Sequence, residues 1–187
     1  MTTSLQVDLA QRVWRMCRMA ARDVWISRAP SPGYVEAVAI MLYMVCCHES
    51  GGFKWRRQMG YLPGSSGGAF GLWQIQTAGV VSALAAIRRN EGLRVRCLHL
   101  LCEWGVMLPE LSGVVLQRMQ EPEGDALSCV VARVYHLLDP VSVPVDLDGI
   151  AGYCKAHHNW SGKATAALYR AAYDRWAPVA HPEWELN

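Results

Sequence analysis

The chain has 187 residues, of which 52% are hydrophobic and 18% are charged, so it has enough apolar material for one well-buried core. Its formal net charge is only +2. A charge this small produces no strong electrostatic field, so the composition argues against a nucleic-acid partner.

The first fifty residues predict two helices. Residues 4–28 carry apolar side chains at intervals of three and four with arginines on the opposite face, which is typical of an amphipathic helix. The segment APSPG at 29–33 breaks that helix. Residues 34–49 are apolar on nearly every side and predict a buried helix. Because Glu36 interrupts this run, it falls short of the ~20 residues that span a bilayer, and we expect no stable membrane insertion.

The rest of the chain predicts a glycine-rich loop followed by more helices. Gly51 and Gly52 end the buried helix, and residues 50–68 are turn-rich, as expected of a loop that borders a cleft. Further helices are expected near residues 78–90, 93–106, 110–120, 125–138, 146–158 and 162–176. Alternating β-branched runs are few, and neither a repeat nor a linker divides the chain. The sequence therefore predicts an all-α fold with a single domain, residues 1–187.

The seven cysteines are an odd number, and Cys46 and Cys47 lie inside the apolar run, where free thiols behave as small core side chains. This usage fits a reduced compartment at synthesis. Two further groups, one around Cys97 and one around Cys154, contain histidines as well, but their spacing lacks the paired CxxC form of structural zinc sites. We expect no metal and no cofactor.

Two unusual strings lie on either side of the predicted loop: HESGG at 48–52 and GAFGLWQIQ at 68–76. Together they resemble motifs of the lytic transglycosylase and goose-type lysozyme family, in which a glutamate followed by serine ends a buried helix. The resemblance extends over residues 34–176, the expected catalytic core, after an N-terminal helix and connection at 1–33. It implies a lysozyme-like fold with Glu49 as the catalytic acid and base. The residues that it implies for substrate binding in these strings are Ser50, Gly71, Leu72, Trp73, Gln74 and Ile75, with Trp73 where methionine is usual.

The position of Glu49 suits this role on physical grounds as well. A carboxyl group at the end of an apolar helix is partly desolvated and faces the negative end of the helix dipole, and both effects disfavour its charged form. A general acid that protonates a glycosidic oxygen near neutral pH must hold its proton. A solvated glutamate without function would gain nothing at such a helix end.

The interval between Glu49 and Glu91 contains no aspartate or glutamate. Glycoside hydrolases normally need a second carboxylate, whereas lytic transglycosylases resemble this chain in working with one glutamate. In that family the 6-hydroxyl of the muramic acid attacks the anomeric carbon and gives a 1,6-anhydro product. The interval favours this chemistry, although Asp139, Asp146 or Asp148 could still supply a distant second carboxylate.

A third stretch, near the C-terminus, corresponds to the Tyr-Asn motif of the same family. Asn159 matches it, while His158 stands where tyrosine is expected, and Tyr135 in a middle segment is implied to face the glutamate. Three tryptophans lie in or beside the motifs, namely Trp55, Trp73 and Trp160. Their rings could stack on sugar rings or simply pack in the core. Gln74 offers both a donor and an acceptor to a substrate.

The resemblance implies that the partner is the glycan strand of peptidoglycan. Because the chain starts without a recognisable secretory signal, we expect a phage product made in the host cytoplasm that acts in the periplasm or cell wall. It would be an endolysin or a virion component, the latter with phage tail proteins as partners. Two alternatives stay open: a hydrolytic muramidase, and a structural tail protein that keeps the fold without catalysis.

Overall fold

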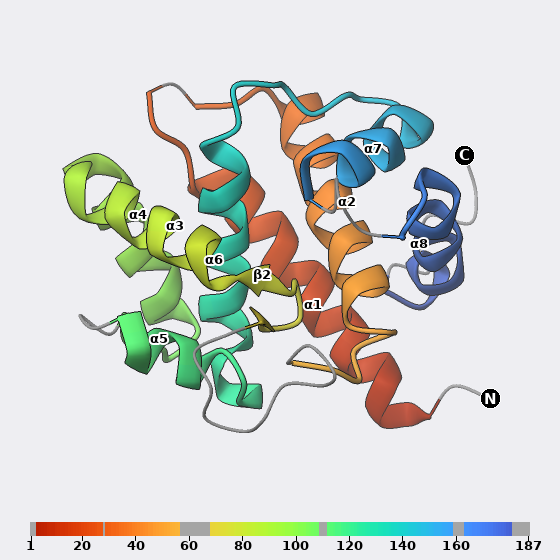
Figure 1. The fold of residues 1–187 in the computed structure, drawn as a ribbon, viewed down its shortest axis with the longest axis horizontal. Helices are drawn as coiled ribbons and strands as arrows, with labels where there is room; N and C mark the ends of the chain where they lie inside the picture. The colour runs from red at the N-terminus through yellow and green to blue at the C-terminus, as the bar shows by residue number, and fades with distance from the viewer. Residues whose placement is uncertain (1–2, 28, 57–67, 109–111, 159–162, 181–187) are drawn as a thin grey trace.

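Helix α2 (Pro32–Glu49) is the central element of the computed structural model, which describes residues 3–27, 29–56, 68–108, 112–158 and 163–180. The helix begins where Ser31 accepts a hydrogen bond from the Tyr34 N–H and Pro32 occupies the first turn, a position where proline costs no hydrogen bond. Every residue from 37 to 47 is buried. Helices α1, α6, α7 and α8 all pack against it (Figure 1). The predicted buried helix is confirmed.

The described residues form eight α-helices and one two-stranded hairpin, which confirms the predicted all-α fold class. The other helices are α1 (Ser4–Asp23), α3 (Thr77–Arg89), α4 (Glu91–Glu103), α5 (Ser112–Arg118), α6 (Asp125–Leu137), α7 (Leu147–Tyr153) and α8 (Ala166–Ala180). Short 3-10 and π-helical turns cover Pro122–Gly124 and Cys154–His158.

Several helix boundaries differ from the prediction, and two of these differences have a clear physical cause. Helix α1 ends at Asp23, five residues early, because Val24 is extended and buried, which turns the chain into the core. Helix α8 continues through Pro178 to Ala180, beyond the predicted end at 176. Its buried residues Tyr169, Tyr173 and Trp176 recur at helical spacing, so burial holds this helix together past a residue that lacks an N–H donor.

The hairpin lies between α2 and α3 and was not predicted. Strand β1 (Ala69–Phe70) pairs antiparallel with β2 (Ile75–Gln76), and the turn at 71–74 joins them. Gly71 has φ +71°, and a Cβ atom there would lie 1.8 Å from the Ser128 hydroxyl oxygen, so only glycine fits. Strands of two residues carry too little sequence pattern to predict.

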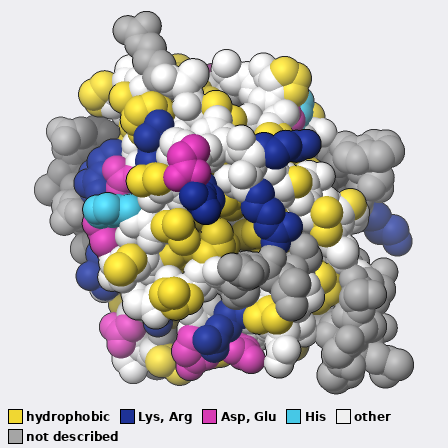
Figure 2. Space-filling model, turned by 90° about the vertical axis from the view of Figure 1, so that its left-hand side faces the viewer, with side chains coloured by type: hydrophobic (Ala, Val, Ile, Leu, Met, Phe, Trp, Pro, Cys, Tyr) yellow, Lys and Arg dark blue, Asp and Glu magenta, His cyan; other side chains and the backbone are white. Residues whose placement is uncertain are grey.

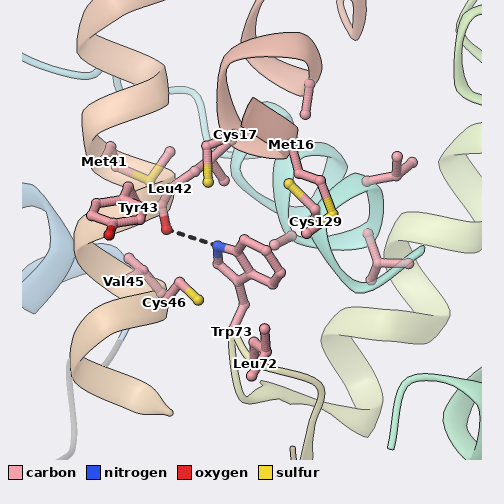
Figure 3. Packing of buried hydrophobic residues seen from close by; sticks show 14 of the residues in the cluster. Met16, Cys17, Met41, Leu42, Tyr43, Val45, Cys46, Leu72, Trp73 and Cys129 are labelled. Atoms are coloured by element: carbon pink, nitrogen blue, oxygen red, sulfur yellow. Dashed lines mark hydrogen bonds between the residues drawn. The ribbon is translucent and has the colours of Figure 1, made fainter. Parts of the chain in front are cut away.

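The buried residues form one continuous cluster, in which several sulfur-bearing side chains surround Trp73 (Figure 3). Figure 3 shows the Trp73 indole between α2 and the side chains of Met16, Cys17 and Cys129. All seven cysteines are free; six are buried and Cys102 is exposed. Burial raises the pKa of the Cys17 thiol well above its ordinary value, so it stays protonated and packs as an apolar group.

The packing of the described residues leaves a gap between α1, α4 and α6. The gap lined by Met16, Leu100 and Val130 has no room for a water molecule. Hydrophobic side chains on the face in Figure 2 lie among Lys and Arg side chains. None of the helices built from these residues has the length and hydrophobicity that crossing a bilayer requires.

Candidate active site

Glu49 lies half-buried in the last turn of α2, as the sequence predicted for a residue that ends a buried helix. The Tyr169 hydroxyl, from α8, donates a hydrogen bond to Glu49 Oε1. Tyr169 is fully buried, and its ring centroid lies 4.2 Å from that of His48. The carboxylate is therefore held by a residue that lies 120 positions further along the chain.

Ser50 fixes the chain directly after Glu49. Its side chain is buried, and its hydroxyl donates to the Cys46 carbonyl at 2.6 Å while accepting from the Phe53 N–H at 2.7 Å. Both hydrogen-bonding directions of the hydroxyl are thus used within the protein. We reassign Ser50 from the implied substrate contact to a structural role in the turn that follows the helix.

Two imidazole rings, those of His48 and His158, interact with the charge of Glu49. Burial lowers the pKa of His158, and the Glu49 charge and a hydrogen bond with the Trp73 backbone partly offset this effect. Burial also lowers the pKa of His48, again with a partial offset from Glu49. Both rings therefore favour the neutral state at neutral pH, in which each can donate one hydrogen bond and accept another.

The predicted substrate-binding string at 71–75 is mostly buried. Leu72 and Trp73 are completely inaccessible and Ile75 is 2% exposed. The Trp73 indole N–H donates to the Leu42 carbonyl at 2.7 Å, pointing away from solvent (Figure 3). A ring without exposed surface cannot stack on a sugar, so we reassign Trp73, Leu72 and Ile75 to core packing.

Gln74 is the member of this string that retains access to solvent. It has φ +48°, a conformation that side-chain-bearing residues rarely adopt, and it is half-buried. Its side-chain Nε2 donates to the Gly71 carbonyl at 2.8 Å, which orients the amide group. No described residue donates a hydrogen bond to its Oε1, an atom that can act as an acceptor.

The remaining residues that were predicted to contact the substrate differ in their exposure to solvent. Tyr135 is half-buried, with its ring edge against Gly79 of α3 and its centroid 6.2 Å from that of His158. Trp55 is 47% exposed and covers Gly51, close in sequence to Glu49, so it can still receive a sugar ring. Asn159 and Trp160 lie outside the described residues.

The three carboxylates that could have acted as a distant second group each have another partner. Asp139 lies 2.6 Å from His157, and Asp148 lies 2.8 Å from Arg170. Asp146 caps α7 by accepting from the Gly149 N–H at 2.7 Å. Each of these three carboxylates is therefore engaged in a contact of its own.

Three residues of the site were not predicted as functional from the sequence: Tyr169, His48 and His136. His136 is 4% exposed, and its Nε2 lies 3.3 Å from His158 Nδ1. The aromatic repeat that includes Tyr169 was a usable signal for a buried helix face, but it does not indicate a contact with Glu49. No group of three or more His, Cys, Asp or Glu side chains in the described part of the chain is arranged to hold a metal ion.

Comparison with protein-family models, with curated proteins and with solved structures finds no match to this chain. The fold and the site define an all-α protein with one half-buried glutamate at the end of its central helix. That glutamate accepts a hydrogen bond from a buried tyrosine and lies near two largely neutral histidines. Its function has to be argued from these residues.

Proposed function

We propose that the protein is a lytic transglycosylase of lysozyme-like fold that cleaves the MurNAc-β-1,4-GlcNAc bond of peptidoglycan glycan strands. The observation that carries the proposal is the position of Glu49, half-buried at the end of a buried helix with Tyr169 donating to its Oε1. The resemblance of the two motifs supports the substrate class. The absence of aspartate and glutamate between Glu49 and Glu91 supports a mechanism with one carboxyl group.

In the proposed reaction the protonated Glu49 donates its proton to the glycosidic oxygen as the bond to the anomeric carbon breaks. The carboxylate that forms then removes the proton from the 6-hydroxyl of the same muramic acid. The freed oxygen attacks the anomeric carbon and closes the 1,6-anhydro ring, so the glutamate regains its proton and no water is consumed. The hydrogen bond from Tyr169 keeps the carboxyl group oriented through both steps.

Two side chains support binding of the sugar next to Glu49. The Gln74 Oε1, to which no described residue donates, can accept a hydrogen bond from a hydroxyl or amide of the glycan. The exposed Trp55 offers a flat apolar face to a pyranose ring. The biological setting that we propose is a phage product, either an endolysin or a virion component, and proteomics of purified virions would separate these two roles.

A second candidate is a structural tail protein without catalysis. It is favoured by one observation: Ser50, Leu72 and Trp73, which belong to the motifs, all have roles in packing or turn formation. Motif residues that serve the fold would persist even if the reaction were lost.

The test is digestion of purified peptidoglycan, with the soluble products identified by mass spectrometry. Wild-type protein is expected to release anhydro-muropeptides, and Glu49→Gln to release none. Glu103→Gln is the matched control, because it makes the same change at the end of another helix, α4, and should keep full activity. Products with reducing ends would indicate a hydrolytic muramidase instead. A wild-type protein that releases nothing would support the structural role.

A further inference from the structure

His136 and His158 form a pair of imidazoles next to the proposed catalytic residue. His136 lies in α6 and His158 ends the π-helical turn after α7, and their rings stack with centroids 5.4 Å apart. His136 Nε2 lies 3.3 Å from His158 Nδ1. The rings are thus joined by one N–H···N hydrogen bond, whose direction depends on which nitrogen carries the proton.

Burial decides the number of protons on the pair. Burial lowers the pKa of His136 far below its ordinary value, and the neighbouring His158 and Arg133 lower it further. Because the pKa of His158 is lowered as well, both rings are neutral at neutral pH. Two neutral rings carry one N–H each, so only two arrangements of protons make the observed hydrogen bond.

The two nitrogens outside this hydrogen bond, His136 Nδ1 and His158 Nε2, have surroundings that decide between the two arrangements. His136 Nδ1 is buried and has no hydrogen-bond partner, so a proton placed there would be an unsatisfied buried donor. Because His158 Nδ1 contacts His136, its other nitrogen, Nε2, is left for the hydrogen bond with the Trp73 backbone. This hydrogen bond raises the pKa of His158, which is the effect of an acceptor, so its backbone partner is the carbonyl oxygen. If Nε2 lacked its proton, two acceptors would face each other.

We propose that His136 is a positioning residue that donates its Nε2–H to His158 Nδ1 and so fixes the tautomer in which His158 Nε2–H binds the Trp73 carbonyl. This arrangement satisfies both hydrogen bonds of His158 and leaves only an acceptor, His136 Nδ1, without a partner. Two consecutive hydrogen bonds then connect α6, the π-helical turn and the turn at 71–74. What it does for the substrate rests on the proposed function, but the proton positions do not.

The consequence is a fixed position for Gln74. Trp73 and Gln74 share the peptide bond whose carbonyl accepts from His158, and Gln74 holds its rare backbone conformation within the same turn. Loss of the hydrogen bond would free this peptide to rotate, and the Gln74 side chain would move with it. His136 would therefore influence a ligand contact that it does not itself make.

The first test is NMR spectroscopy of the imidazole nitrogens at neutral pH, compared between wild type, His136→Gln and His136→Leu. Glutamine can still donate to His158 Nδ1, whereas leucine cannot. We expect the Nε2–H tautomer at His158 in wild type and in His136→Gln, and a mixture of tautomers in His136→Leu. The amide resonance of Gln74 should shift in His136→Leu and stay near its wild-type position in His136→Gln.

A His158 that carries its proton on Nδ1 in wild type would overturn the proposal, as would the same tautomer and Gln74 resonance in all three proteins. Thermal unfolding identifies a variant that has lost its fold. If His136→Leu does not fold, the wild type and His136→Gln still decide, because the glutamine variant must retain the Nε2–H form.

A kinetic test addresses the substrate. With peptidoglycan, His136→Leu is expected to raise KM about tenfold with a smaller change in kcat, because it displaces a binding residue and leaves Glu49 and Tyr169 in place. His136→Gln should restore the wild-type KM. Equal KM values in both variants would contradict the positioning role. A wild-type protein without glycan-cleaving activity would refute the proposed function alone, since the NMR result is independent of it.

Discussion

Replacing Trp73 by phenylalanine tests whether this residue serves the fold or the substrate. The change removes roughly 50 Å² of buried apolar surface, worth about 1.2 kcal/mol at ~25 cal/mol per Å². It also removes the hydrogen bond to the Leu42 carbonyl, worth about 1 kcal/mol, and leaves a small cavity. We expect the free energy of unfolding to fall by about 2 to 3 kcal/mol.

Urea denaturation measures this loss, and Trp55→Phe is the matched control. Trp55 is 47% exposed, so its replacement should change the free energy of unfolding by no more than about 0.5 kcal/mol. The refuting result is a Trp73→Phe protein of wild-type stability that binds glycan strands more weakly. That outcome would return Trp73 to the sugar-binding surface and contradict the burial argument.

Three further predictions follow from single contacts. Gly71→Ala should destabilise the protein more than Gly105→Ala in urea denaturation: both glycines have positive φ, costing about 1–2 kcal/mol each, but only Gly71 adds a steric clash, with Ser128. Tyr169→Phe should lower kcat on peptidoglycan and leave KM nearly unchanged, because the hydroxyl acts through Glu49; an unchanged kcat would argue against this role. The melting temperature should fall as the pH drops below 6.5, the ordinary histidine pKa. Burial lowers the pKa of His136 in the folded protein, so below this pH the unfolded chain binds a proton that the folded protein does not. Its share is at most about 1.4 kcal/mol per pH unit, and His136→Gln should flatten the dependence.

The fold class and most helix positions could be predicted from the sequence because hydrophobic periodicity and breakers act locally. The run at 34–49 is apolar on all sides, which only a helix in the centre of the core can accommodate, and α2 has that position. The hairpin at 69–76 could not be predicted, because its strands are two residues long and its turn depends on a close approach to Ser128. The single domain and the lysozyme-like detail stay predictions.

The candidate site was predictable only where its residues are adjacent in sequence. Glu49 was identified because its helix and the glycines after it define its surroundings locally. Tyr169 and His136 reach the site through the packing of α8 and α6, and no local pattern indicates such contacts. For the same reason the sequence left open whether Trp73 binds a sugar or packs in the core: a motif gives the identity of a side chain, whereas its direction depends on the helices around it.

Because six of the seven thiols are buried and one is exposed, the rates at which they react with a thiol reagent can report on opening motions of the protein. Cys102, on the surface of α4, should react at once with a thiol reagent and can carry a single fluorescent or spin label without any engineered cysteine. The six buried thiols can react only when the helices around them separate. The rates at which Cys46 and Cys47 become modified would therefore measure how often α2 is exposed in the native protein, and a ligand that binds near Glu49 should slow them.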